Sequence, residues 1–158
     1  MTEYNPYSPP TVEISSSEQD QFEYVGFWLR LVATIIDSII IIIVTLPPLI
    51  AIYGVGYFES ESAVQGFADF FLSYIFPAIV IILFWIYKQA SPGKMAISAI
   101  IVDADTGNKP SIGQLVGRYF GYFISSIPLG FGLLWVAVDK RKQGWHDKLA
   151  GTVVIKRR

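Results

Sequence analysis

The sequence predicts an all-α polytopic membrane protein that carries a small β element. The chain of 158 residues is 53% hydrophobic but only 16% charged, below the charged share of about 25% in soluble domains. Two of its stretches are apolar over nearly the thickness of a bilayer. Residues 1–29 hold five acidic residues and no basic one, whereas eleven Lys and Arg face four Asp from residue 88 onward. These observations exclude an ordinary soluble domain and a wholly disordered chain.

The first 23 residues differ in composition from the rest. They combine acidic residues with prolines and a serine run, and they contain almost no large aliphatic side chain. We expect residues 1–23 to form a disordered cytoplasmic tail in front of a membrane domain at 24–158. The tail lacks the basic and apolar regions of a signal peptide, so the first apolar segment is expected to be a retained anchor.

Two membrane-spanning helices are predicted, at about 28–46 and 70–87. The first has nineteen residues, which at 1.5 Å each extend about 28 Å, close to the ~30 Å of a hydrocarbon core. Pro47-Pro48 is expected to end or kink this helix, and Pro77 to kink the second. The loop between the helices has no Lys or Arg, whereas a basic flank follows the second helix. The positive-inside rule then predicts that both chain termini are cytoplasmic.

A third apolar helical segment is predicted at about 112–138. If its most apolar part, 119–138, crossed the bilayer, seven basic residues near the C-terminus would lie outside, against the positive-inside rule. Pro128, Gly130 and Gly132 form a cluster of helix breakers in the middle of this part. A re-entrant hairpin of two short helices with both ends cytoplasmic is therefore favoured, and a full third span is the alternative.

Two short stretches rich in β-branched residues, at about 95–104 and 152–156, are predicted to form a small two-stranded cytoplasmic element. Isolated strands are stable only when paired. These two can pair only if they lie on the same side of the membrane. This requirement also favours the hairpin over the full third span.

The helix within the third segment has a clear predicted start and an unusual face. Ser111 and Gln114 have the spacing of a capping box. Small residues then follow at strict four-residue intervals, at Gly113, Gly117, Gly121 and Ser125. A ridge without large side chains lets another helix approach closely. The ridge serves either internal packing against the first two helices, which is favoured, or a seam between two copies of the chain.

Two charged residues lie inside the first predicted span, Asp37 near its middle and Arg30 near its cytoplasmic end. A spacing of seven residues puts them on nearly one face of the helix, about 10 Å apart along its axis. A carboxylate at the bilayer centre costs at least ~2.5 kcal/mol, so it either has a partner or has a function. One interpretation is that Arg30, Arg118 or a backbone donor holds Asp37 and fixes the helix register. The other is a protonatable or cation-binding site on a transport path.

Further charges surround the predicted hairpin. Arg118 either extends its head to the membrane interface or is the partner that Asp37 needs. Asp147 is expected to cap or salt-bridge a cytoplasmic turn, and Asp139 is a further supporting charge. The segment 91–94 resembles a phosphate loop only superficially, because the required first glycine and the final Ser or Thr are missing. We interpret it as a turn with a basic interfacial anchor.

Reactive side chains are scarce in this sequence. It contains no cysteine and a single histidine, His146, which gives no basis for a metal site, a cofactor site or a catalytic triad. The net charge of −1 creates no overall field that favours nucleic acid. We therefore expect a protein without enzymatic activity, metal, cofactor or nucleic-acid partner.

The order and spacing of several motifs resemble the RDD family of small bacterial membrane proteins, over residues 24–157. The matching motifs are Gly26-Phe-Trp-Leu-Arg30 followed by Asp37, Ser91-Pro-Gly-Lys94, Val102-Asp-Ala-Asp-Thr-Gly107, Arg118, Gly144-Trp-His-Asp147 and Ala150-Gly-Thr-Val-Val154. The family is named for one arginine and two aspartates. By this resemblance, Arg30 and Asp37 are the arginine and the first aspartate, and Asp147 rather than Asp139 is the second.

The resemblance implies a multi-pass protein of the bacterial cytoplasmic (inner) membrane, for which transport is proposed, usually cation/proton exchange. The first hypothesis is transport of a small solute, a monovalent cation or a proton, with Arg30 and Asp37 at the functional site. Two or three spans are too few to enclose a path, so this hypothesis requires a homo-oligomer or a membrane-protein partner in the lipid bilayer. The second hypothesis is a non-transporting assembly or regulatory subunit of a larger complex.

Overall fold

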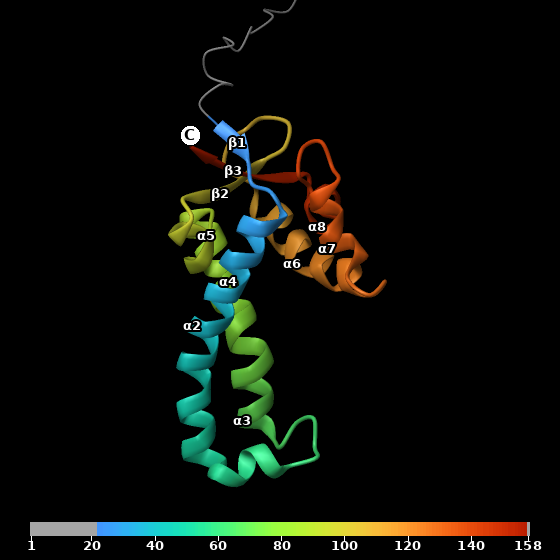
Figure 1. The fold of residues 1–158 in the computed structure, drawn as a ribbon. Helices are drawn as coiled ribbons and strands as arrows, with labels where there is room; N and C mark the ends of the chain where they lie inside the picture. The colour runs from blue at the N-terminus through green and yellow to red at the C-terminus, as the bar shows by residue number, and fades with distance from the viewer. Residues whose placement is uncertain (1–21, 158) are drawn as a thin grey trace, which may run out of the picture.

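The computed structural model describes residues 22–157, which form a long two-helix stem and a head at one end of it (Figure 1). The stem consists of α2 (Phe27–Tyr53) and a second helical segment, Phe67–Lys88. The head comprises β1 (Phe22–Tyr24), α5 (Pro92–Ala96), β2 (Ala99–Asp103), α6 (Ile112–Ser126), α7 (Phe131–Leu134), α8 (Trp145–Ala150) and β3 (Thr152–Arg157). The predicted tail lies outside the described residues up to position 21.

The stem helix α2 is longer than predicted, because Pro47 and Pro48 lie inside it and do not end it. The fixed φ of proline fits a helix, and a helix in hydrocarbon keeps its remaining hydrogen bonds because no water can replace them. Near the prolines, the Thr45 hydroxyl donates a hydrogen bond of 2.9 Å to the carbonyl of Ile41. The helix ends instead at Gly54, whose φ of 72° is readily adopted only by glycine.

The second stem segment runs without interruption from Phe67 to Lys88. It consists of α3 (Phe67–Phe70), a π-helical turn (Phe71–Ile75) and α4 (Phe76–Lys88). Pro77 lies in the first turn of α4, directly after the π-helical turn, and such a widened turn accommodates a residue that cannot donate its N–H. Both stem helices are long and apolar enough to cross a membrane, as the sequence predicts.

A three-stranded antiparallel sheet caps the stem, in the order β1–β3–β2. The predicted pairing of 95–104 with 152–156 is confirmed for β2 and β3, with Ile101 opposite Val154. β2 begins at Ala99 and not at the predicted position 95, because the residues before it belong to α5 and to a turn with a positive φ.

The third strand, β1, is absent from the sequence-based prediction. It lies antiparallel to β3, with Phe22 opposite Arg157 and Glu23 opposite Lys156, and the Lys156 ammonium lies 2.8 Å from the Glu23 carboxylate. Phe22 and Glu23 thus belong to the sheet rather than to the tail. A strand of three residues is too short to show the alternating pattern from which strands are predicted.

The head and the stem share one apolar core. Its buried members are Val25, Trp85, Ala99, Ile101, Leu115 and Val154. They come from the link between β1 and α2, the last turns of α4, two strands of the sheet and α6. The core therefore fixes the sheet over the end of the stem at which α2 begins and α4 ends (Figure 1).

The third apolar segment is a bent pair of helices. α6 and α7, the latter continued by a 3₁₀ turn at Trp135–Ala137, make an angle of 115°. The bend falls at Leu129 and Gly130, which have φ values of 51° and 79°, so the predicted break is confirmed. α7 returns closely along α6, since a Cβ on Gly132 would lie 2.7 Å from the Ser125 Cα. The pair is preceded by β2 and followed by α8, so both of its ends connect to the sheet region, as a re-entrant segment requires; its relation to the membrane stays a prediction.

Candidate functional site

Arg30 and Asp37 do not pair with each other. The Arg30 Nη1 lies 2.5 Å from Asp147 Oδ2. The same guanidinium donates from Nε to the carbonyl of Val25 at 2.9 Å and from Nη2 to that of Lys142 at 2.6 Å. Seven residues along one helix leave about 10 Å between the two positions, so each side chain meets a partner from elsewhere in the chain.

Asp147 is the centre of a buried ion cluster, formed with Arg30 and Arg118. Its fully buried carboxylate pairs with both guanidinium groups and accepts the backbone N–H of Gly144 at 2.9 Å, which caps the start of α8. Burial raises the pKa of Asp147, but Arg118 and Arg30 lower it by more, and the pKa lies well below its usual range. The cluster therefore holds an ionised carboxylate at neutral pH.

Arg118 is buried rather than extended to an interface. It donates from Nη1 to the Thr152 hydroxyl at 2.7 Å and pairs with Asp147. Its guanidinium lies 5.5 Å from the ring centre of Trp85 and 5.9 Å from that of Tyr122. Among the residues that the structure describes, its Nε and Nη2 have no hydrogen-bond acceptor. Arg118 is thus a member of the ion cluster and not the direct partner of the carboxylate on α2.

Asp37 joins the stem to α5. Its carboxylate accepts the Ser91 hydroxyl at 2.5 Å and the backbone N–H of Gly93 at 2.6 Å. The two backbones nearly touch here, because a Cβ on Gly93 would lie only 1.9 Å from the carbonyl oxygen of Ala33. The sequence suggested Arg30, Arg118 or a backbone donor as the partner of Asp37, and the structure shows a backbone donor.

Lys94 is a buried cation, although its sequence context suggested an interfacial anchor. It is 7% exposed, and its ammonium lies 5.7 Å from the Trp85 ring centre and 3.4 Å from the Ser91 hydroxyl. Burial lowers the pKa of Lys94. The sequence signal for the burial of Lys94 was the adjacent Gly93, because a glycine often marks a place where the backbone approaches another segment closely.

A cavity of about 310 Å³ lies between the stem and α6. Its polar wall includes Asp37, Ser91 and Lys94, whereas Ile41 and Ile81 line it about one turn farther along each stem helix from the head. No group of three His, Cys, Asp or Glu side chains that would suit a metal ion occurs among residues 22–157. The charged side chains on the cavity wall are the carboxylate of Asp37 and the ammonium of Lys94.

Another element packs closely against only the second half of the ridge of small residues on α6. A Cβ on Gly121 would lie 2.9 Å from the His146 Cα, and the Ser125 hydroxyl accepts the His146 N–H at 3.0 Å. An added Cβ at Gly117 would meet nothing within 4 Å, and at Gly113 its nearest contact would be at 3.9 Å. The ridge thus packs against α8, where packing against the first two helices was expected.

His146 connects the ridge to the ion cluster. Its buried ring stacks on Tyr122, with 4.0 Å between ring centres, and its Nε2 lies 3.5 Å from Asp147 Oδ2. Burial lowers the pKa of His146 to about 3, even though the Asp147 carboxylate acts in the opposite direction. The imidazole is therefore neutral at physiological pH and serves as a packing residue of α8.

Asp139 lies apart from the ion cluster. Its carboxylate pairs with the half-exposed Lys148 at 2.5 Å and accepts the backbone N–H of Gln143 at 3.1 Å. It stabilises the turn before α8. The structure thus places Asp147, and not Asp139, beside Arg30.

Comparison with known proteins identifies a family for this chain. The sequence profile of the RDD family matches residues 24–151. The uncharacterized protein YxaI of Bacillus subtilis (strain 168) is 32% identical over 149 aligned residues, covering 82% of this chain and 95% of that protein. The uncharacterized protein RP437 of Rickettsia prowazekii (strain Madrid E) is 41% identical over 75 residues, 48% of this chain.

The match to the Rickettsia protein spans only 41% of its length. No solved structure matches the chain. The family profile covers most of the sequence, including the ion cluster, Asp37 and the cavity wall. Together with two helices long and apolar enough to cross a bilayer, these matches show a membrane protein, and the chain belongs to the RDD family.

Proposed function

We propose that this protein transports a small solute across the cell membrane and binds it in the cavity between the stem and α6. The position of Asp37 carries the proposal. This carboxylate lies on a stem helix and on the cavity wall, where Ser91 and Gly93 hold it in one orientation. An ionisable residue within a spanning helix is costly and commonly marks an ion or substrate path.

The two groups of charges have different roles in this proposal. The ion cluster of Arg30, Arg118 and Asp147 is closed on itself and fastens α8 to the stem, so we assign it a structural role. Asp37 lies on the wall of a cavity that has room for a bound group. We assign to it the binding of a proton or monovalent cation that accompanies the solute. The protein then binds and moves its solute without chemical conversion.

A single copy does not enclose a path through a bilayer. Only 11% of each candidate span is buried inside the chain. A polar path needs protein on all sides, because lipid offers no hydrogen-bond partners. We therefore propose a homo-oligomer, or a complex with another membrane protein, in which exposed faces of the stem become internal.

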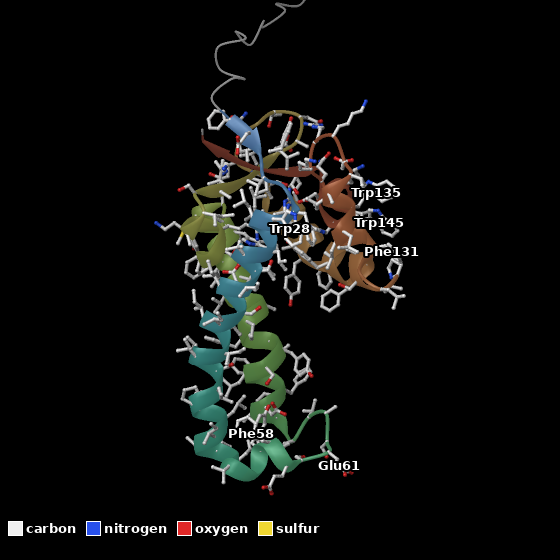
Figure 2. The ribbon with its side chains drawn as sticks, viewed as in Figure 1. Trp28, Phe58, Glu61, Phe131, Trp135 and Trp145 are labelled. Atoms are coloured by element: carbon white, nitrogen blue, oxygen red, sulfur yellow. The ribbon has the colours of Figure 1, made fainter. Side chains whose placement is uncertain are left out.

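The head is assigned to the cytoplasmic side of a bacterial cytoplasmic (inner) membrane, together with both chain termini. Figure 2 places Trp28, Trp135 and Trp145 near the head, and Phe58 and Glu61 at the far end of the stem. Tryptophans favour the membrane interface, which supports a bilayer surface near the head. The loop at the far end has acidic residues but no Lys or Arg, as expected of an external loop.

Reconstitution into liposomes that contain a pH-sensitive dye tests the proposal. Gradients of Na⁺, K⁺ or Li⁺ are imposed, and proton flux is compared with that of protein-free liposomes. The proposal expects cation-dependent flux and an oligomer in lipid. A protein that stays monomeric and carries no flux contradicts it, and would favour a non-transporting assembly or regulatory subunit that co-purifies with a stable partner.

A further inference from the structure

The buried charges beside the cavity do not balance. Lys94, Arg30 and Arg118 are the cations of this group, and Asp37 and Asp147 are its carboxylates. Direct contacts or close electrostatic interactions connect all five. Charges in a low-dielectric environment are normally paired. With Lys94 protonated, three cations face two carboxylates and the group is short of one negative charge, which agrees with the lowering of the Lys94 pKa by burial.

Lys94 is the cation of this group that lacks an ion-pair partner among residues 22–157, whereas Arg30 and Arg118 share Asp147. Its ammonium has three protons to donate, and its described hydrogen bond is a long one of 3.4 Å to the Ser91 hydroxyl. The side chain is only 7% exposed and lies on the cavity wall. An under-coordinated ammonium at the edge of an empty space is the position at which an anionic group would be stabilised.

The cavity is mostly apolar, and its charged side chains lie near the head. Lys94 and Ser91 lie beside the head, and Ile41, Ile81 and Phe123 are among the apolar residues of the wall. Its volume of about 310 Å³ lies at the small end of the range for pockets that hold small molecules. A fully polar anion would leave the apolar wall without a partner, and an apolar molecule would leave Lys94 unpaired.

We propose that the cavity binds an amphipathic monoanion, whose single carboxylate or phosphate group contacts Lys94 and whose apolar part lies along Ile41, Ile81 and Phe123. This inference rests on the proposed function, because it names the chemical class of the transported solute. The anionic group can belong to a membrane lipid or to a soluble organic acid, and the test separates these sources.

Equilibrium dialysis of radiolabelled decanoate against the full chain in phosphatidylcholine nanodiscs tests the binding, with protein-free nanodiscs subtracted. We expect decanoate to bind at least about tenfold more tightly than decanol, because only decanoate offers a charge to Lys94. Equal binding of decanol and decanoate would overturn the inference. This comparison uses the unmodified protein and does not depend on the folding of a variant.

A pair of lysine variants locates the charge. Lys94→Gln removes the buried ammonium, and Lys88→Gln removes an exposed one at the end of α4. We expect Lys94→Gln to weaken decanoate binding about tenfold or more and Lys88→Gln to leave it unchanged. Unchanged binding in Lys94→Gln, with the variant folded, would also overturn the inference.

The source of the anion is distinguished by adding phosphatidylglycerol to the nanodiscs. Competition with decanoate would support a lipid headgroup, and no competition would support a soluble organic acid. Decanoate flux into liposomes separates this inference from the proposed function. Binding without any flux leaves the inference standing and contradicts transport, whereas flux with no preference for decanoate over decanol in binding contradicts the inference alone.

Discussion

Gly93 allows the backbones of α5 and α2 to approach so closely that Asp37 can accept its N–H. Gly93→Ala would place a Cβ 1.9 Å from the carbonyl oxygen of Ala33, so the helices must move apart. We expect a loss of about 1–3 kcal/mol in unfolding free energy. Thermal unfolding in detergent measures it, with Gly117→Ala as control, because that site is open in mid-helix and should gain about 0.5–1 kcal/mol. Equal stability of the two variants would contradict the close approach.

Asp147 compensates two buried guanidinium groups, so its charge is expected to be essential for stability. Asp147→Asn should cost about 3–5 kcal/mol, because it leaves Arg30 and Arg118 buried without a carboxylate. Asp139→Asn is the matched control, since its partner Lys148 is half exposed, and it should cost about 0–1 kcal/mol. Chemical unfolding of both variants in the same detergent measures the difference, and a similar loss in both would refute the structural role of the cluster.

The burial of His146 in its neutral form is expected to make the protein less stable in mild acid. The folded chain keeps the imidazole neutral down to about pH 3, whereas the unfolded chain takes up a proton near the ordinary pKa of 6.5. Protonation therefore favours unfolding as the pH falls below 6.5, by up to about 1.4 kcal/mol per pH unit. The lowered pKa values of Asp147, Asp139 and Asp103 affect stability only when the pH approaches their ordinary value of 3.8.

The melting temperature measured from about pH 6.5 to pH 4.5 isolates this effect. His146→Phe retains a ring that can stack on Tyr122 but cannot titrate. Its melting temperature should change little over this interval while that of the wild type falls. The same slope in both proteins would show that His146 is not the responsible group.

At the level of single residues, sequence reasoning identified the important charges but not their contacts. Arg30 and Asp37 stood out because charges within apolar segments are rare, whereas Asp147 was singled out by the resemblance to the RDD family. Their pairing depends on how α8 and α5 approach α2, and helical spacing describes only residues on one helix. Lys94 was interpreted as an interfacial anchor, and its burial was missed for the same reason, because that burial results from the position of α5.

The elements follow from local patterns wherever those patterns are strong. The apolar lengths predicted both stem helices, and the breaker cluster around Pro128 predicted the bend between α6 and α7. The length of α2 beyond Pro47 was missed, because the cost of a proline depends on whether water can reach the backbone. β1 was missed because it has only three residues and exists through its pairing with β3.

The bent pair α6–α7 predicts a specific labelling pattern, which is clean because the chain has no cysteine of its own. In a re-entrant hairpin, Asn108→Cys and Lys140→Cys should react with a membrane-impermeant maleimide from the same side of sealed vesicles. Glu61→Cys should react from the other side. Leu129→Cys, at a tip that is 91% exposed in the isolated chain, should be protected by lipid. Labelling of positions 108 and 140 from opposite sides would establish a full third span instead.

The whole molecule combines an apolar stem with a head in which distant segments of the chain converge. Charge segregation along the sequence predicts that the head lies on the cytoplasmic side, and this side stays a prediction. The cavity could not be predicted, because its wall comes from four helices whose relative positions depend on long-range contacts. Its location where the stem meets the head places Asp37 and Lys94 beside a space that a solute can occupy.

The decisive measurement for the role of Asp37 in transport is the cation-dependent flux of Asp37→Asn in liposomes, divided by the amount of folded protein. Asp69→Asn is the matched control, because Asp69 is also a buried carboxylate of the stem but bonds to Tyr57 and Gln65, away from the cavity. If Asp37 binds the transported cation or proton, Asp37→Asn should reduce cation-dependent flux about tenfold or more, while Asp69→Asn retains it. Full flux in Asp37→Asn would exclude a role of Asp37 in transport and leave it as a residue that only joins α2 to α5.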